Sequence, residues 1–306
     1  MAQTRIFHRT GCDSAAPRPP RPRLALMCLA AVLQASLVAC SSARAPSASI
    51  HPTATPSVSA TITHPTRTAT FTPGSGPTLP GWNLVWDAEF TGNTLNTSQW
   101  QPVDTMVPST VGCCVQYANQ DWSPANVRVS GGALHLISVK QPQNGYIYTS
   151  GAVTTMGTYA FEYGRVDIRA KLSTTSGLWP AAWLLPVTGT SPGYSPYEID
   201  MLEAWGSQPT TVHFFFHWPS SQLGCEAQGP NYAAGYHTYT LLWTATLIEW
   251  QVDGATDCVV TSNIPHTPMY FILSAAIDGA LESTNASTIL PQSFDIQYVR
   301  VWRTDA

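Results

Sequence analysis

Residues 165–172 alternate strictly between polar and apolar side chains and read RVDIRAKL. Successive side chains of a β-strand point to opposite faces of a sheet, so this pattern indicates a strand with one buried and one solvated face. Two further segments carry the turn signals of β-hairpins, because strand-like runs flank Gly131-Gly132 and another run leads into Asp253-Gly254. The chain is therefore constrained to a fold built from paired strands.

Strand patterns and turn residues continue from Gly81 to a last strand pattern at Val299–Trp302, without an amphipathic helix or an internal repeat. A segment of this length made of short strands and turns is typical of one β-sandwich or barrel. We therefore predict a single all-β domain over residues 81–306.

The first forty residues have the composition of a targeting segment. Five arginines precede an apolar stretch, Leu24–Ala39, which suits the core of a signal peptide and is short for a transmembrane helix. The stretch ends in Leu37-Val38-Ala39-Cys40, which resembles the lipobox of bacterial lipoproteins. We predict a signal peptide with a lipobox over residues 1–40, lipidation of Cys40, and an extracellular or cell-surface location. Ordinary cleavage after Ala45 is the alternative.

Residues 41–80 are dominated by Ser, Thr, Pro and Ala. Such a segment cannot bury enough apolar surface to offset the chain entropy lost on folding. We predict a disordered linker over residues 41–80 that holds the following domain away from the membrane.

The chain has 14 basic and 18 acidic residues and a net charge of −4. Removal of residues 1–39 takes away five arginines, and the only lysines are Lys140 and Lys171. No basic patch remains that could bind nucleic acid, so a neutral or weakly charged substrate is favoured. We predict no nucleic-acid partner, and contact with the membrane only through the lipid anchor.

Four cysteines remain once the leader and Cys40 are set aside: Cys113, Cys114, Cys225 and Cys258. An even number of cysteines outside the cytoplasm indicates disulfides, and four cysteines leave three connectivities open. Neighbouring cysteines rarely bond to each other because the geometry is strained. A zinc site is the alternative, but no spacing of His or Cys supports one, so we predict no metal ligands.

Three carboxylates lie within six residues of one apolar segment: Glu198, Asp200 and Glu203. On a regular strand Glu198 and Asp200 share one face, whereas Glu203 would point to the other. A β-bulge at Met201-Leu202 would add one residue and return Glu203 to the acidic face.

Like charges gathered on a buried strand are costly, and their pKa values are pushed apart. The cost is understandable where one carboxyl must be ionised and its neighbour protonated, as a retaining glycosidase requires. A solvated acidic strand is the simpler alternative, but Ile199, Met201 and Leu202 make this a core strand. We therefore predict a carboxylate active site on this segment.

The segment resembles the Glu-x-Asp-x-x-Glu signature of glycoside hydrolase family 16, in particular its laminarinase-like branch. Further blocks within residues 82–304 are similar to the family pattern: Leu84–Phe90, Tyr148–Gly151, Tyr163–Val166, Gly177–Trp183, His237–Tyr239, Trp243, Val252–Gly254 and Tyr298–Val301. The resemblance implies a β-jelly-roll sandwich of two curved antiparallel sheets, concanavalin-like, with a concave substrate cleft. It implies that residues 81–306 are the catalytic domain of a monomeric enzyme.

The resemblance also implies the roles of the acids. Glu198 would be the nucleophile, Glu203 the general acid/base and Asp200 their helper in a retaining endo-hydrolysis of a β-linked polysaccharide. The expected substrate is β-1,3- or mixed-linkage β-glucan. The alternatives are a non-catalytic glucan-binding protein on the same fold, a transglycosylase, and an agarase-type galactanase.

Substrate-binding residues follow from the same resemblance. Trp179 and Trp183 are four residues apart and share a strand face, and we expect both to line the cleft, with core packing as the alternative. We expect Trp205 to lie on the same face as Glu203. The family pattern adds three substrate-contacting residues: Arg165, His217 and Gln116.

A structural calcium ion is common in the family, held by one carboxylate in the opening strand and one near the end of the domain. Glu89 fits the first position, but Gln297 stands where the second acid is expected. A calcium ion would need hard oxygen ligands elsewhere, so we predict no required cofactor, with a structural calcium as the alternative. Asp278 departs from the pattern too, since it replaces a usual glycine.

Overall fold

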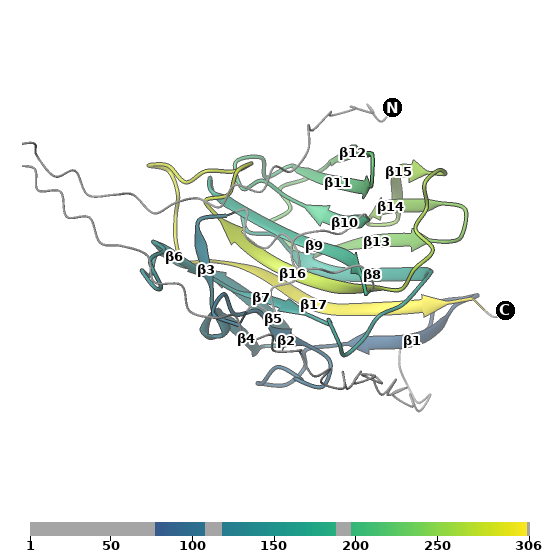
Figure 1. The fold of residues 1–306 in the computed structure, drawn as a ribbon, viewed down its shortest axis with the longest axis horizontal. Helices are drawn as coiled ribbons and strands as arrows, with labels where there is room; N and C mark the ends of the chain where they lie inside the picture. The colour runs from purple at the N-terminus through teal and green to yellow at the C-terminus, as the bar shows by residue number, and fades with distance from the viewer. Residues whose placement is uncertain (1–76, 108–117, 188–196, 305–306) are drawn as a thin grey trace, which may run out of the picture. The chain divides into compact units, whose positions relative to one another are not determined.

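The computed structural model describes residues 77–107, 118–187 and 197–304, all of which belong to one compact unit. One layer of this unit is an eight-stranded antiparallel sheet (Figure 1). The strand order is β15-β14-β13-β8-β17-β5-β4, and β1 also pairs with β17. The strands of this sheet are β1 (Asn83–Ala88), β4 (Val127–Ser130), β5 (Ala133–Ser138), β8 (Gly164–Lys171), β13 (His237–Trp243), β14 (Ile248–Val252), β15 (Ala255–Val260) and β17 (Gln292–Arg303).

The second layer is a seven-stranded antiparallel sheet with the order β12-β11-β10-β9-β16-β7-β2. Its strands are β2 (Gln101–Pro102), β7 (Ala152–Thr154), β9 (Leu178–Pro186), β10 (Glu198–Glu203), β11 (Thr211–Trp218), β12 (Ser221–Gln228) and β16 (Met269–Ile277). The remaining elements of the described residues are a parallel strand pair and one short 3-10 helix: β3 (Gln120–Trp122), β6 (Tyr148–Ser150) and η2 (Pro124–Asn126).

The main hydrophobic core lies between the two large sheets, and both contribute to it. From β8 it takes Val166, Ile168 and Ala170, which are fully buried, whereas the polar residues between them face outward. From β10 it takes Ile199, Met201 and Leu202. The strand thus points its apolar side chains inward and leaves its acids on the outer face of the seven-stranded sheet.

The structure confirms the elements that the sequence predicts most strongly. Residues 164–171 form β8, with the predicted half-buried alternation. The hairpin turns at Gly131-Gly132 and Asp253-Gly254 have positive φ at all four residues, as tight two-residue hairpin turns require. The prediction of an all-β sandwich of two antiparallel sheets is confirmed.

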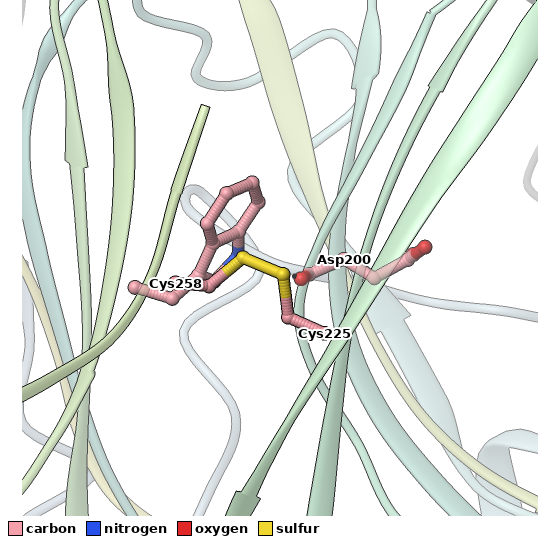
Figure 2. Close-up of a disulfide and its surroundings, with 4 residues drawn as sticks. Asp200, Cys225 and Cys258 are labelled. Atoms are coloured by element: carbon pink, nitrogen blue, oxygen red, sulfur yellow. Dashed lines mark hydrogen bonds between the residues drawn. A yellow bond between two sulfur atoms is a disulfide. The ribbon is translucent and has the colours of Figure 1, made fainter. Parts of the chain in front are cut away.

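One disulfide joins the edges of the two sheets. Cys225 on β12 is bonded to Cys258 on β15, which selects one of the pairings that the sequence left open. β12 ends the seven-stranded sheet and β15 ends the eight-stranded sheet. The bond therefore fixes one sheet to the other at their shared edge (Figure 2).

Several predictions fall outside the described residues. They concern the signal peptide with Cys40, nearly all of the linker, Cys113, Cys114 and Gln116. No helix formed by the described residues is long and apolar enough to span a membrane.

Candidate active site

The acid strand β10 contains the predicted β-bulge. Its register with β9 pairs Asp200 with Trp183 and then Leu202 with Ala182, so Met201 is the extra residue. On the β11 side, the three steps from Asp200 to Glu203 run against only two steps of the neighbouring strand. Glu203 therefore returns to the face that carries Glu198 and Asp200.

A histidine from β11 joins the acids. His217 is the register partner of Glu198, and its Nε2 lies 3.0 Å from Oδ2 of Asp200 and 4.0 Å from Oε1 of Glu198. The side chain of Asp200 is 2 % exposed, whereas that of Glu198 is 24 % exposed. The site thus combines one accessible carboxyl with two buried ones, since Glu203 is also buried.

Burial controls the protonation of the two inner acids. It raises the pKa of Asp200 to about 8, and a hydrogen bond with Glu198 opposes part of that rise. Burial also raises the pKa of Glu203 well above its ordinary value, and the nearby charges of Asp200 and Glu198 add to the effect. His217 and Trp179 act in the opposite direction on Glu203. Burial therefore favours the protonated forms of Glu203 and Asp200 beside the more exposed Glu198.

The raised pKa of Asp200 makes the free energy of unfolding depend on pH, and this dependence can be measured. Because the pKa of Asp200 is higher in the folded protein than in the unfolded chain, its contribution is most favourable at low pH. The contribution of Asp200 is lost as pH rises from about 4 towards 8. Over this range the Asp200 carboxyl is ionised in the unfolded chain but still protonated in the folded protein.

We expect Asp200→Asn to raise Tm at pH 8 by a few degrees, and to change Tm much less at pH 4. About 1 kcal/mol moves Tm by about 2–4 °C in a domain of this size. Differential scanning fluorimetry at both pH values measures the difference. A lower Tm for the variant at pH 8 would contradict the assigned protonation of Asp200.

The predicted tryptophans lie near the acids, but they are not equally accessible. Trp183 is opposite Asp200 in the register, yet it is 7 % exposed, and its indole N–H donates to Oγ of Ser274 at 3.3 Å. It belongs to a second apolar cluster on this face of the sheet, and so offers little surface to a ligand. Trp179 and Trp205 are partly exposed, and the Trp179 side chain hydrogen-bonds Glu203.

The face of β11 beside the acids carries two residues that the sequence analysis missed. His213, Phe215 and His217 alternate along this strand, and Trp205 stacks on His213 with 3.8 Å between ring centroids. Phe215 needs the neighbouring Gly224, because a Cβ there would come within 2.7 Å of its ring. The period-two spacing of His213, Phe215 and His217 is the signal that could have revealed this row.

Glu282 is a third residue that the sequence analysis missed. Its carboxylate accepts the backbone N–H groups of Gly177, at 3.1 Å, and Ser207, at 3.0 Å. It thereby joins the turn before Trp179 to the turn after Trp205. No local pattern signals this contact, because the partners are 105 and 75 residues away in sequence.

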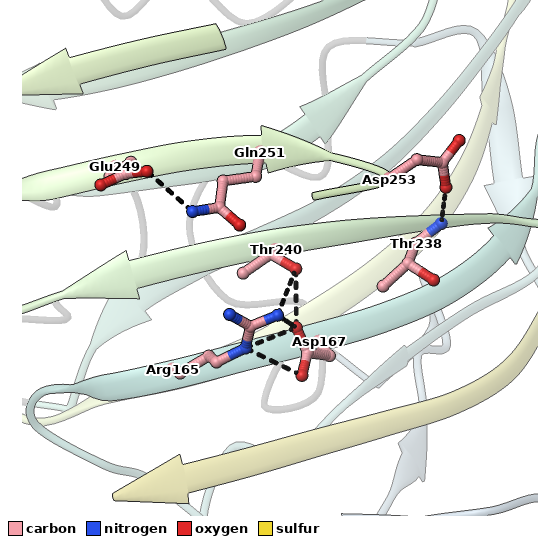
Figure 3. A network of polar contacts seen from close by, with 7 residues as sticks. All are labelled: Arg165, Asp167, Thr238, Thr240, Glu249, Gln251 and Asp253. Carbon is pink, nitrogen blue, oxygen red and sulfur yellow. Dashed lines mark hydrogen bonds and ion pairs between the residues drawn. The ribbon is translucent and has the colours of Figure 1, made fainter. Parts of the chain in front are cut away.

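Arg165, which the resemblance implies to contact the substrate, is not in the sheet that carries the acids. Arg165 lies on β8 in the other sheet, on the face turned away from the core. There it pairs with Asp167 at 2.9 Å within a polar network that includes Thr240 (Figure 3). The pattern of β8 predicted the strand correctly but did not reveal that its solvated face belongs to the opposite sheet.

The residues considered for calcium are engaged in other contacts. Glu89 forms a two-bond ion pair with Arg300, at 2.7 and 3.0 Å, and Gln297 accepts a hydrogen bond from Arg169. These residues do not fit a calcium site, because an arginine occupies the carboxylate that would bind the ion.

Asp278 adopts a positive φ of 57°, which explains why glycine suits that position.

Among the described residues, Glu198, Asp200 and His217 form a cluster whose polar atoms lie within 4.8 Å of one another. Such a group could contact one metal ion, so the prediction that the site has no metal ligands stays a prediction. The burial of Asp200 and Glu203 and the resulting rise of their pKa values fit proton transfer better than the binding of a hard cation.

The chain is similar in sequence to known proteins. The chain is 35% identical over 269 residues to glucan endo-1,3-beta-glucosidase A1 of Niallia circulans, covering 74% of this chain and 39% of that protein. It is 31% identical over 244 residues to the endo-1,3-1,4-beta-glycanase ExsH of Rhizobium meliloti, covering 74% of this chain and 49% of that protein. The chain therefore spans less than half the length of these curated relatives.

A solved structure matches over nearly its whole length. The catalytic domain of an endo-1,3-beta-glucanase (laminarinase) from Thermotoga petrophila superposes with a TM-score of 0.67 at 26% identity, covering 74% of this chain and 99% of that domain. The family model described as glycosyl hydrolases family 16 matches residues 115–300, which include all three acids. The chain belongs to glycosyl hydrolase family 16.

Proposed function

We propose that this chain is a retaining endo-hydrolase of β-1,3- or mixed-linkage β-glucan. The observation that carries the proposal is the bulge of β10, which brings Glu198, Asp200 and Glu203 onto one face. The relatives support the substrate class, since one is described as an endo-1,3-beta-glucosidase and another as an endo-1,3-1,4-beta-glycanase.

The protonation of the acids supports their roles. Burial and the neighbouring carboxylates favour the protonated form of Glu203, which can donate its proton to the oxygen of the departing sugar. Glu198 is the more exposed carboxyl and attacks the anomeric carbon from the opposite side of the sugar ring. Glu203, now ionised, then takes a proton from water, and the water releases the sugar from Glu198. Two inversions at one carbon retain the β configuration.

Asp200 and His217 keep the nucleophile in place. Asp200 hydrogen-bonds Glu198, and His217 approaches both carboxyls. A protonated Asp200 can donate a hydrogen bond to the Glu198 carboxylate, which orients that group and partly stabilises its negative charge. Trp179, which hydrogen-bonds Glu203, and Trp205 offer partly exposed indole surface, which suits stacking against sugar rings.

The release of reducing ends from laminarin, lichenan, agarose and xyloglucan tests the proposal. We expect cleavage of laminarin, lichenan or both into oligosaccharides of mixed length, as endo-cleavage produces. Cleavage of agarose alone would identify a galactan, and not β-glucan, as the substrate. Larger products formed from added oligosaccharide would indicate transglycosylation. Binding to laminarin without cleavage would favour the non-catalytic glucan-binding alternative.

We also propose that the mature protein is anchored to the bacterial surface through a lipid on Cys40, with the linker of residues 41–80 as its tether. The sequence Leu37-Val38-Ala39-Cys40 after an apolar segment supports this. We expect a fatty-acid analogue to label the wild-type protein and not Cys40→Ala, and the variant to move to the soluble fraction. Labelling that persists in Cys40→Ala would contradict the lipobox.

A further inference from the structure

The bulge of the acid strand is contacted from the opposite sheet. The indole N–H of Trp250, on β14, donates to the backbone carbonyl oxygen of Asp200 at 2.9 Å. Trp250 is 1 % exposed, so this bond crosses the interior of the sandwich. The contact joins the centre of the active site to a strand that bears none of the acids.

A backbone carbonyl rarely points into the core from the middle of a sheet. In an antiparallel sheet the carbonyls lie in the plane of the sheet and accept hydrogen bonds from neighbouring strands. The register of β10 slips immediately after Asp200 against both of its neighbours, and a bulge leaves local groups outside the regular ladder. A buried carbonyl at such a point needs another donor, and the Trp250 indole supplies it.

The Trp250 indole is itself held in place. Its ring stacks on Phe214 of β11, at 6.3 Å between centroids. In the register of β14 with β15, Trp250 is opposite Cys258, which is bonded to Cys225 on β12. Figure 2 draws this disulfide together with Asp200. The strand pair that carries Trp250 is therefore fixed covalently to the sheet that carries the acids.

We propose that Trp250 is a positioning residue for catalysis: its indole N–H holds the β10 bulge in the form that keeps Glu203 beside Glu198 and Asp200. The inference rests on the proposed function for its catalytic consequence. Trp250 touches no substrate and acts only through the main chain of Asp200.

Loss of the indole N–H has a specific consequence. The Asp200 carbonyl would be left buried without a donor, so the peptide between Asp200 and Met201 would turn back toward the ladder. The bulge would then relax and Glu203 would move away from the other two acids. The transition state needs both glutamates aligned, and a displacement of about 1 Å can reduce a rate about 100-fold. Substrate-contacting surface on β9 and β11 would be unchanged.

Trp250→Phe tests the proposal, and Trp243→Phe is its matched control. Trp243 lies on β13 of the same sheet and is 0 % exposed, but its indole nitrogen has no hydrogen-bond partner in the described structure. Both variants lose similar ring volume, and only one loses a hydrogen bond. With laminarin as substrate, well below the Tm of either variant, we expect kcat to fall at least about tenfold in Trp250→Phe and less than about threefold in Trp243→Phe. KM should stay within about twofold in both, because neither touches the substrate.

The pH profile separates positioning from a general loss of stability. Glu203 is faced by Asp200 and Glu198 on β10 and by His213 and His217 on β11, while its register partner on β9 is Ala181. Nearby carboxylates help to keep Glu203 protonated. If Glu203 moves away from them, the alkaline limb of kcat/KM shifts to lower pH in Trp250→Phe and not in Trp243→Phe.

Each outcome supports or overturns the inference. If Trp250→Phe does not fold, 3-benzothienylalanine at position 250 keeps the ring shape, replaces the N–H with sulfur, and should give the same loss of kcat. Equal kcat values and unshifted pH profiles in the two tryptophan variants would overturn the inference while the proposed function stands. If the wild-type protein cleaves no glucan, the proposed function fails. In that case, crystal structures of the two tryptophan variants test whether Trp250 holds the bulge. The pairing of Leu202 with Ala182 should be lost in Trp250→Phe and kept in Trp243→Phe.

Discussion

Replacement of Glu198 or Glu203 by glutamine is expected to lower kcat on laminarin or lichenan by about 1,000-fold or more in either variant. Loss of general acid–base catalysis alone accounts for about 100- to 10,000-fold, and loss of the nucleophile removes the covalent route altogether. Glutamine has the size of glutamate, so the bulge and the apolar packing of β10 are preserved. Because the two groups act on one bond as a unit, the double variant should be little worse than either single variant.

Glu249→Gln is the matched control for these variants. Glu249 lies on β14 in the eight-stranded sheet and accepts a hydrogen bond from Gln251 (Figure 3). It accepts another from Thr256. Glu249 is half-exposed between the buried Ile248 and Trp250 and so lies on the face turned away from the core, and its loss should leave kcat within about twofold. Reducing-end assays on purified variants, with circular dichroism to check folding, measure the effect. Wild-type turnover in either Glu198→Gln or Glu203→Gln would refute the assignment of that residue.

The position of the acids could be predicted from the sequence because β10 obeys a local rule with one exception. Apolar residues alternate with acids until Met201 and Leu202 occur together, and a bulge is the one-residue correction that restores a single acidic face. The register confirms that correction. The turns were equally predictable, because Gly131, Gly132 and Gly254 mark positions of positive φ.

Other parts of the site depend on contacts that no local pattern carries. The alternation of Arg165 with its neighbours shows that one face of β8 is solvated, but it does not show which sheet β8 joins. The contact of Glu282 with the turns before Trp179 and after Trp205 links segments far apart in sequence. In the sequence, Trp250 is only one residue of the strand-like run before Asp253-Gly254, since its hydrogen bond to Asp200 depends on how the two sheets face each other.

The burial of Trp183 also could not be predicted from the sequence. Its spacing from Trp179 correctly predicts a shared face on β9. Whether that face is open or covered depends on β3 and β16, which supply Trp122, Tyr270 and Ile272 to the cluster around Trp183. Sequence spacing thus predicts the direction of a side chain, while its accessibility is decided by segments that pack over it.

Chemical rescue of alanine variants by azide is expected to distinguish the roles of the two glutamates most clearly. The substrate for this test is an aryl β-glucoside or oligoglucoside with a good leaving group. Such a substrate needs little protonation, so Glu203→Ala should still form the glycosyl-enzyme on Glu198. The intermediate should then accumulate, because no base activates water. Azide needs no base, and should raise turnover by about tenfold or more and give the β-glycosyl azide.

Glu198→Ala should give the opposite anomer. Without the nucleophile, azide can occupy the space left on the opposite side of the sugar ring and attack the anomeric carbon directly, in a single inversion that gives the α-glycosyl azide. Glu203 is intact in this variant and still assists the leaving group. Proton NMR of the first product distinguishes the two anomers, and Glu249→Ala with azide serves as the control that should form no azide product. Exchange of the two anomers between the variants would exchange the roles of Glu198 and Glu203, and failure of both to form a β-azide would contradict the double-displacement mechanism.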